Sequence, residues 1–246
     1  MLRQLEKIEM AEPLLQIQSA DVFYGASQIL FGVDLDVKKG QTMALLGRNG
    51  AGKSTTFKMI AGIAPPRRGK VLLGGVPVSG RPPFRIARAG IGYVPEDRQV
   101  FPEHTVDDNL IVGAKKGPHG EDHWTRERIY EVFPLLAEMK NRNAGRLSGG
   151  EQQMLTIART LMGNPEVILL DEPSEGLAPI IVQAIGELIK MLRDMGVTIL
   201  LAEQNMHFCL GIATHATVID KGQIVYSATI EELRNNEAIK QRYLAV

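Results

Sequence analysis

The chain has few of the features that mark secreted, membrane-spanning or nucleic-acid-binding proteins. Of its 246 residues only Cys209 is a cysteine, so no internal disulfide can form, which fits a reducing compartment. Its 28 Lys and Arg residues balance 28 Asp and Glu residues, which removes any bulk attraction to nucleic acid or to an acidic membrane. We therefore expect no nucleic-acid partner. No apolar run approaches the roughly 18 residues that span a bilayer, so a role at a membrane requires other subunits to cross it.

The composition and the hydrophobic pattern predict an α/β protein. Hydrophobic residues make up 44% of the chain and charged residues 23%, as in an ordinary soluble globular protein. Apolar runs at Met43–Leu46, Val167–Leu170 and Thr198–Leu201 predict strands that are buried on both faces. Between the last two runs, apolar residues at helical spacing predict a helix that ends at Gly196. This strand–helix–strand order indicates a mostly parallel sheet.

Two further patterns interrupt the parallel sheet. The segments Val71–Val78 and Val218–Tyr226 resemble hairpins, which predicts antiparallel pieces beside the parallel core. The stretch from Thr105 to Met162 is helical in pattern and more polar, and Thr105 is expected to cap its first helix. We expect this stretch to be a helical insertion between two strands of the parallel sheet.

A glycine-rich loop between a buried strand and a helix predicts a phosphate site. Residues Gly47–Ser54 read Gly-Arg-Asn-Gly-Ala-Gly-Lys-Ser and fit the pattern G-x-x-x-x-G-K-[ST]. The glycines let backbone N–H groups surround phosphates at the amino terminus of a helix. Lys53 would neutralise the terminal phosphates, and the hydroxyl of Ser54 would bind Mg²⁺.

Two adjacent acids follow the second buried strand. Asp171 and Glu172 come directly after Val167–Leu170. Asp171 is expected to hold Mg²⁺, directly or through water, and Glu172 to polarise the water that attacks the terminal phosphate. Since many strands end in acids, this pair supports phosphate chemistry only together with the glycine-rich loop.

The segment Leu147–Gln153, Leu-Ser-Gly-Gly-Glu-Gln-Gln, has a local and a functional interpretation. Locally, Ser148 and Glu151 form a capping box at the start of an amphipathic helix. Gly149 and Gly150, however, weaken a first helical turn for no local benefit. They leave bare N–H groups that a phosphate could approach.

These three motifs resemble those of the ATP-binding cassette (ABC) ATPases. The family signature is L-S-G-G-[EQ], and the order of phosphate loop, signature and Asp-Glu strand is the same, with Ser148 standing 23 residues before Asp171. The resemblance implies a P-loop ATPase core with an antiparallel β subdomain and an inserted helical subdomain. It implies one nucleotide-binding domain over residues 1–246, with the core and β subdomain at about 14–100 and 163–246 and the helical signature subdomain at about 101–162.

The resemblance also implies the remaining residues of the ATP site. Tyr24 stands where the family stacks an aromatic ring on adenine, although an ordinary strand aromatic is the alternative. The signature would contact the ATP held by a second cassette, through Ser148, Gly149, Gly150 and Glu151. That cassette must be a second ABC ATPase subunit, or another copy of this chain when it is isolated. The nucleotide-binding loop comprises Gly47, Arg48, Asn49, Gly50, Ala51, Gly52, Lys53, Ser54 and Thr55.

The chain departs from the common family pattern at three positions. Glu96 replaces the glutamine that reaches toward Mg²⁺, so it adds a negative charge beside the triphosphate. Gln204 replaces the histidine that contacts the γ-phosphate, which keeps a hydrogen-bond donor but removes the option of positive charge. Ala178 replaces an aspartate before Pro179. We assign Glu96 to the metal site and Gln204 to the catalytic site as expectations.

The residues at these three positions resemble those of the second ATPase subunit of importers of the branched-chain amino acid type. The resemblance extends from about Leu14 to the end of the chain. It implies ATP and Mg²⁺ as cofactors, two transmembrane permease subunits as partners, and a periplasmic substrate-binding protein as an indirect partner. It implies a peripheral position on the cytoplasmic face of the inner membrane. Related importers carry amides, urea or aromatic carboxylates, so the cargo stays open.

Three other classes remain as alternatives. An ABC exporter ATPase has an overlapping motif set, but its usual glutamine and histidine are missing here. A soluble ABC ATPase of translation or DNA repair generally joins two cassettes or inserts long coiled coils, for which 246 residues are too few. A phosphate-loop kinase outside the ABC family would leave Leu147–Gln153 unexplained.

Overall fold

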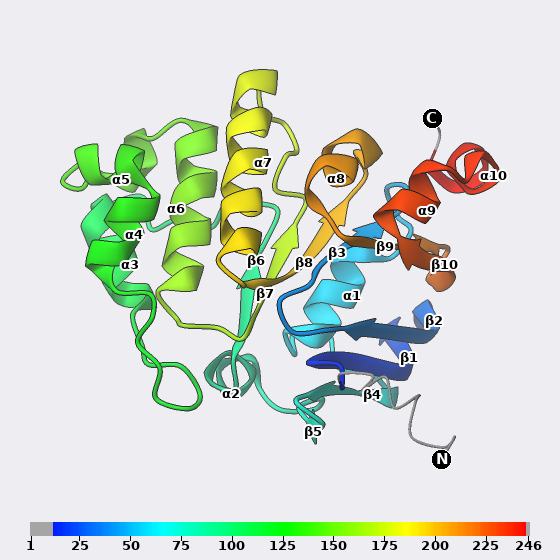
Figure 1. Cartoon of the computed structure of the whole chain (residues 1–246). Helices are drawn as coiled ribbons and strands as arrows, with labels where there is room; N and C mark the ends of the chain where they lie inside the picture. Colours follow the sequence, from blue (N-terminus) through cyan, green and yellow to red (C-terminus); the bar gives the residue numbers. More distant parts are fainter. Residues whose placement is uncertain (1–11, 245–246) are drawn as a thin grey trace, which may run out of the picture.

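The computed structural model describes residues 12–244, which form two sheets with helices around them (Figure 1). The smaller sheet is antiparallel, and its strands in spatial order are β2 (Ser27–Val37), β1 (Leu15–Tyr24), β4 (Arg68–Leu73) and β5 (Val76–Pro77). The larger sheet has the order β10 (Gln223–Thr229), β9 (His215–Asp220), β3 (Thr42–Leu46), β8 (Thr198–Glu203), β7 (Val167–Asp171) and β6 (Ile91–Val94). All its neighbouring strands are parallel except β10, which pairs antiparallel with β9.

The larger sheet is buried on both faces, as the three apolar runs predicted. In β7 and β8 the side chains alternate between the two hydrophobic clusters of the molecule, so that Ile168 and Ile199 enter one cluster and Leu169 and Leu200 the other. One cluster includes α1 (Lys53–Ile60) and the smaller sheet, and the other includes α7 (Pro179–Asp194). A parallel sheet needs such cover on both faces, which explains why its strands are apolar throughout.

The predicted helical insertion lies between β6 and β7, which are neighbours in the larger sheet. Thr105 caps its first helix, because the Thr105 side chain accepts the N–H of Asp108 and the Asp108 side chain accepts the N–H of Thr105. Figure 1 shows this part as a separate group of helices at the left of the view. Its members are α3 (Val106–Gly113), α4 (Arg126–Val132), α5 (Pro134–Glu138), the 3₁₀ turn η1 (Ala144–Arg146) and α6 (Gly149–Leu161).

The remaining elements complete the two hairpins and the end of the chain. Both predicted hairpins are present, as β4 with β5 and β9 with β10. The other helices are α2 (Pro83–Arg88), α8 (Met206–Ile212), α9 (Ile230–Arg234), α10 (Glu237–Ile239) and the π-helical turn η2 (Lys240–Leu244). The prediction of an α/β fold with antiparallel and helical additions is confirmed.

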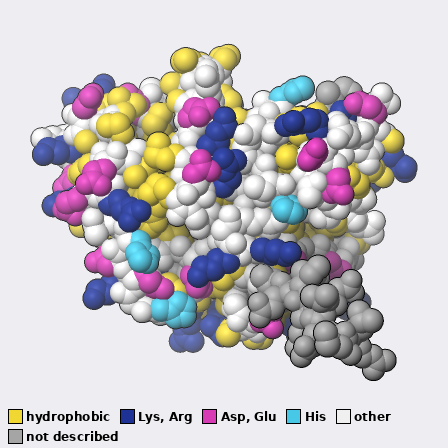
Figure 2. Space-filling model, viewed as in Figure 1, with side chains coloured by type: hydrophobic (Ala, Val, Ile, Leu, Met, Phe, Trp, Pro, Cys, Tyr) yellow, Lys and Arg dark blue, Asp and Glu magenta, His cyan; other side chains and the backbone are white. Residues whose placement is uncertain are grey.

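The surface agrees with the balanced charge of the sequence. Figure 2 shows basic and acidic side chains interspersed over the visible face, while hydrophobic side chains gather over α6 and the amino-terminal end of α7. Ile180, in the first turn of α7, is 70% exposed. Within residues 12–244, no helix combines the length and the apolar character needed to cross a bilayer.

Candidate active site

The phosphate loop connects β3 to α1, as the sequence predicted. Gly50 and Gly52 adopt left-handed backbone conformations, with φ of 79° and 115°, which other residues rarely adopt. A side chain at Gly47 would collide with the carbonyl oxygen of Ile219 in β9. The loop is therefore closed tightly against the sheet, and its N–H groups lie at the amino terminus of α1, where an anion is stabilised by the helix dipole.

Lys53 is buried within this loop and is only 3% exposed. Its Nζ donates hydrogen bonds to the carbonyl oxygens of Gly47 at 2.8 Å and Arg48 at 3.1 Å. The same Nζ lies 3.1 Å from Oε1 of Glu172, which is 9% exposed. The cation and the expected base thus form a buried ion pair across the site.

Asp171, the last residue of β7, accepts hydrogen bonds from two hydroxyl groups. The Ser54 hydroxyl donates to Oδ1 at 3.1 Å, and the Tyr93 hydroxyl donates to Oδ2 at 3.1 Å. Burial raises the pKa of Asp171, and the negative charges of Glu172 and Glu96 add to this, whereas the two hydroxyl groups lower it. Burial and the Asp171 charge raise the pKa of Tyr93.

The chemistry of this donor set fits Mg²⁺. The Ser54 hydroxyl and the Asp171 carboxylate are hard oxygen ligands within hydrogen-bond distance of each other. Mg²⁺ usually takes one or two protein oxygens and completes its shell with water and phosphate oxygens. Among the described residues, no group of three or more His, Cys, Asp or Glu side chains is arranged to hold a metal by itself.

Glu172 has an unusual backbone conformation. Its φ is +47°, in the left-handed region that costs a non-glycine residue about 1–3 kcal/mol. Its N–H donates to the carbonyl oxygen of Ala202 in β8 at 3.0 Å, and its own carbonyl oxygen accepts the N–H of Glu175 at 3.1 Å. This turn directs the carboxylate of Glu172 to Lys53 instead of continuing the strand.

Several other acids lie near Glu172. The pKa of Glu175 is raised to about 7 by a hydrogen bond with Glu172, by partial burial, and by the negative charges of Glu172, Glu96 and Glu203. Glu96 itself is exposed, in the loop after β6. Its charge is nevertheless close enough to raise the pKa values of both Asp171 and Glu175. Glu96 is therefore near Asp171 and Glu175, and its assignment to the metal site stays a prediction.

Sequence reasoning missed Glu203, which precedes Gln204. Gln204 is exposed at the end of β8, whereas Glu203 is buried. Burial raises the pKa of Glu203, and hydrogen bonds from Ser174 and Asn205 lower it. The sequence contained one signal for Glu203: like Asp171, it is an acid at the carboxyl end of an apolar parallel strand. The ligand-binding residues of α/β proteins commonly lie at the carboxyl ends of such strands.

The signature segment has the predicted capping box. The Ser148 Oγ accepts the N–H of Glu151 at 3.3 Å, and Oε2 of Glu151 accepts the N–H of Ser148 at 2.6 Å. Figure 1 shows the amino-terminal ends of α6 and α1 well apart in the plane of the view, with α7 between them. The structure thus brings Lys53 and Ser54 together with Asp171 and Glu172, but it leaves the signature outside this group.

The two signature glycines have a packing role that the sequence did not predict. A Cβ at Gly150 would overlap Cγ2 of Ile181 in α7, and a Cβ at Gly149 would lie 2.7 Å from Nη1 of Arg98. Arg98 also donates a hydrogen bond to the carbonyl oxygen of Glu175. Both glycines therefore allow close packing of the first turn of α6, which periodicity along α6 alone does not reveal.

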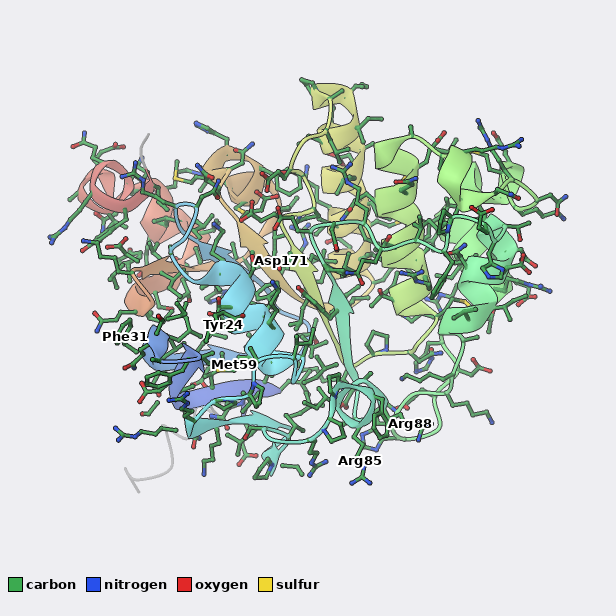
Figure 3. The ribbon with its side chains drawn as sticks, turned by 180° about the vertical axis from the view of Figure 1, so that it is seen from behind. Tyr24, Phe31, Met59, Arg85, Arg88 and Asp171 are labelled. Carbon is green, nitrogen blue, oxygen red and sulfur yellow. The ribbon has the colours of Figure 1, made fainter. Side chains whose placement is uncertain are left out.

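Tyr24 lies at the end of β1 and is 48% exposed. Its ring is thus available to a planar ligand, as stacking on adenine requires. The helix α1 packs against β2, the neighbour of β1, and against β7, which ends at Asp171. Figure 3 labels Tyr24 and Asp171 in the view from behind.

Comparison with known proteins identifies a family and individual relatives for this chain. The family model described as "ABC transporter" matches residues 30–175. The branched-chain amino acid transport ATP-binding protein BraG of Pseudomonas aeruginosa is 41% identical over 231 residues, covering 94% of this chain and 99% of BraG. The lipopolysaccharide export ATP-binding protein LptB of Haemophilus influenzae is 34% identical over 223 residues, covering 90% of this chain and 92% of LptB.

Among solved structures, the fold is similar to the ADP conformation of an ATP-binding cassette of an ABC transporter. That likeness has a TM-score of 0.79 and 26% identity, and it covers 93% of this chain and 97% of the other. The matched family model includes the phosphate loop, the signature and the Asp-Glu pair. This chain therefore belongs to the ABC transporter family, as an ATP-binding and ATP-hydrolysing subunit of a transporter.

Proposed function

We propose that this chain hydrolyses MgATP to power an importer of branched-chain amino acids or of related small carboxylates and amides. The observation that carries the proposal is the 41% identity with BraG over nearly the full length of both chains. The unusual Glu96, Ala178 and Gln204, which the sequence associates with the same type of importer, support it independently of the overall identity.

In the proposed reaction, the loop Gly47–Thr55 binds the phosphates of ATP. Its N–H groups and the dipole of α1 face the anion, and Lys53 turns from Glu172 to the terminal phosphates. Ser54 and Asp171 would hold Mg²⁺, with Glu96 at the edge of that site. When bound, Mg²⁺ neutralises the charge that develops on the phosphate oxygens. Tyr24 stacks on the adenine ring.

Hydrolysis then depends on the carboxylate of Glu172. Once ATP has drawn Lys53 away, Glu172 is free to accept a proton from the water that attacks the γ-phosphorus. The bond between the γ-phosphorus and the β–γ bridging oxygen breaks in the same reaction, and ADP and phosphate leave. The exposed Gln204 donates a hydrogen bond to the γ-phosphate in the position where most of the family has histidine. The raised pKa of the neighbouring Glu175 limits the negative charge around the base below about pH 7.

We infer that a second cassette completes the ATP site. The signature residues Ser148–Gly150 and Glu151 form the N-cap and first turn of α6, apart from the phosphate loop of the same chain (Figure 1). In this arrangement they serve the ATP bound by a partner cassette. The partner is a second ABC ATPase subunit, and self-association replaces it when the chain is isolated.

The remaining partners follow from the proposed transport function. Two permease subunits span the membrane, and a periplasmic binding protein delivers the cargo to them. The chain sits peripherally on the cytoplasmic face of the inner membrane. The loop 96–102 connects β6 to the helical insertion, and its Phe101 is 44% exposed. This loop is therefore the proposed contact with a permease helix.

Lipopolysaccharide export is the second candidate function. It is favoured by the 34% identity with LptB over 90% of this chain. The two functions predict different partners and cargo, although the ATP chemistry is the same.

Gene neighbourhood and reconstitution test these alternatives. Import predicts two permease genes, a second cassette gene and a periplasmic binding protein gene beside this one. The assembled complex in proteoliposomes should then take up labelled leucine or a related amide when ATP is added on the cassette side. A complex with Glu172→Gln is the matched control and should bind cargo without uptake. Release of a lipid from the bilayer in place of uptake would contradict import and support export.

A further inference from the structure

Glu203 is a buried carboxylate at the carboxyl end of β8. It is 2% exposed, and within residues 12–244 it forms no ion pair. Its Oε1 accepts the N–H of Ser174 at 3.2 Å, and its Oε2 accepts the N–H of Asn205 at 3.3 Å. Burying an unpaired carboxylate is costly, and an apolar side chain of similar size would serve the core better. The two hydrogen bonds show what the carboxylate does there.

The two N–H groups belong to the two loops of the candidate site. Ser174 lies two residues after Glu172, and Asn205 directly follows Gln204. Each oxygen of Glu203 thus holds one of these loops. The same strand also supports Glu172 through the carbonyl oxygen of Ala202, which accepts the Glu172 N–H at 3.0 Å.

The conformation of Glu172 makes this support necessary. Its left-handed φ of +47° is strained, and such a conformation persists only where surrounding contacts enforce it. The bond from Ser174 to Glu203 restrains the turn that follows Glu172. The bond from Asn205 restrains the residue after Gln204, at the start of α8.

We propose that Glu203 is a positioning residue for hydrolysis, which holds the Glu172 loop and the Gln204 loop in a fixed relation. It does not touch ATP and acts through those two loops. This inference rests on the proposed role of Glu172 as the base. A carboxylate suits the task because both of its oxygens accept hydrogen bonds, whereas an amide offers one acceptor and turns a donor toward the other N–H.

Glu203→Gln in the full chain tests the proposal. We expect kcat for ATP hydrolysis to fall at least tenfold, while the dissociation constant for ATP, measured without turnover, stays within twofold. Binding is spared because Lys53 and Ser54 lie on α1, whereas the Glu203 side chain accepts its two hydrogen bonds from Ser174 and Asn205. Thr198→Val is the matched control: Thr198 is equally buried at the other end of β8, and its Oγ1 accepts the Gly40 N–H at 2.9 Å. This control should retain the parent kcat.

Three results would overturn the proposal. The first is a parent-like kcat for Glu203→Gln while Glu172→Gln is inactive. The second is a parallel loss of kcat and ATP affinity, and the third is an equal loss in Thr198→Val, since both indicate general structural damage. If Glu172→Gln hydrolyses ATP at the parent rate, the assigned base is wrong, and the role of Glu203 falls with it.

Two further variants keep the test decisive. Adding Glu203→Gln to a chain that carries both Glu172→Gln and Gln204→Ala should lower the residual rate no further, because Glu203 acts through the loops of those two residues; a further tenfold loss would contradict this. If Glu203→Gln does not fold, Glu203→Asp replaces it. The shorter side chain keeps the charge but cannot reach both N–H groups, so kcat should again fall at least tenfold with ATP affinity unchanged. A parent-like kcat in a folded Glu203→Asp would refute the proposal.

Discussion

Replacing Glu172 with glutamine should separate ATP binding from hydrolysis. In the free chain, Glu172 Oε1 lies 3.1 Å from Lys53 Nζ, and both side chains are buried. ATP must therefore compete with Glu172 for Lys53. Glu172→Gln removes this competition and the base in one step, so we expect ATP to bind more tightly and to remain intact.

The magnitude follows from the geometry of the pair. At 3.1 Å and an effective dielectric constant of about 20, the Coulomb attraction is about 5 kcal/mol. The Glu172→Gln variant retains part of this stabilisation, because Lys53 keeps its hydrogen bonds to Gly47 and Arg48 and the glutamine oxygen still accepts a hydrogen bond. We expect a gain of about 1.4 kcal/mol in ATP binding, which is about tenfold in affinity. Hydrolysis should fall by about 10²–10⁴-fold, as expected for the loss of a general base.

Titration with a fluorescent ATP analogue and a phosphate-release assay measure the two quantities. Glu166→Gln is the matched control, because Glu166 immediately precedes β7, at the opposite end from Glu172, and pairs only with His119 among the described residues. It should change neither quantity. Hydrolysis at the parent rate would show that Glu172 is not the base. Loss of affinity in step with hydrolysis would show that the ion pair supports the site and does not compete with ATP.

Three further predictions concern neighbouring groups. Lys53→Ala removes the phosphate counter-charge and leaves Glu172 buried without its cation, so ATP affinity should fall and urea unfolding should show a loss of about 3–5 kcal/mol; unchanged affinity would exclude a phosphate contact. The pKa of Glu175 is about 7 in the folded chain and 4.5 ordinarily, so its stabilising contribution is complete below about pH 4.5 and is lost as the pH rises through 7. The melting temperature of Glu175→Gln relative to the parent should accordingly rise from pH 5 to pH 8, and a constant difference would contradict this. Gly150→Ala should cost about 1–3 kcal/mol in unfolding free energy because the methyl group overlaps Ile181, whereas Gly149→Ala should cost less, since it meets only the flexible end of an arginine; equal costs would refute the packing argument.

The signature segment has one feature that neighbouring residues in the sequence predict and one that they do not. The capping box of Ser148 and Glu151 was predictable, because both partners lie within one helical turn. The packing role of Gly149 and Gly150 was not, because the atoms that fill the missing side chains belong to Arg98 and Ile181 on other elements. A glycine pair in a first turn signals a close approach, but its neighbours depend on how α6 meets α7 and the loop after β6.

The sequence alone determined the features whose parts are contiguous in the chain. The phosphate loop is one, since a buried strand, glycines and a helix follow one another between Thr42 and Ile60. The buried runs of β7 and β8 are others, because apolar continuity is a local property. Tertiary structure decided which distant groups meet. The order β3–β8–β7 places the carboxyl ends of three strands side by side, and this brings Lys53 to Glu172 and Glu203 to Ser174. Strand order depends on packing of the whole chain around the sheet, and no local pattern carries it.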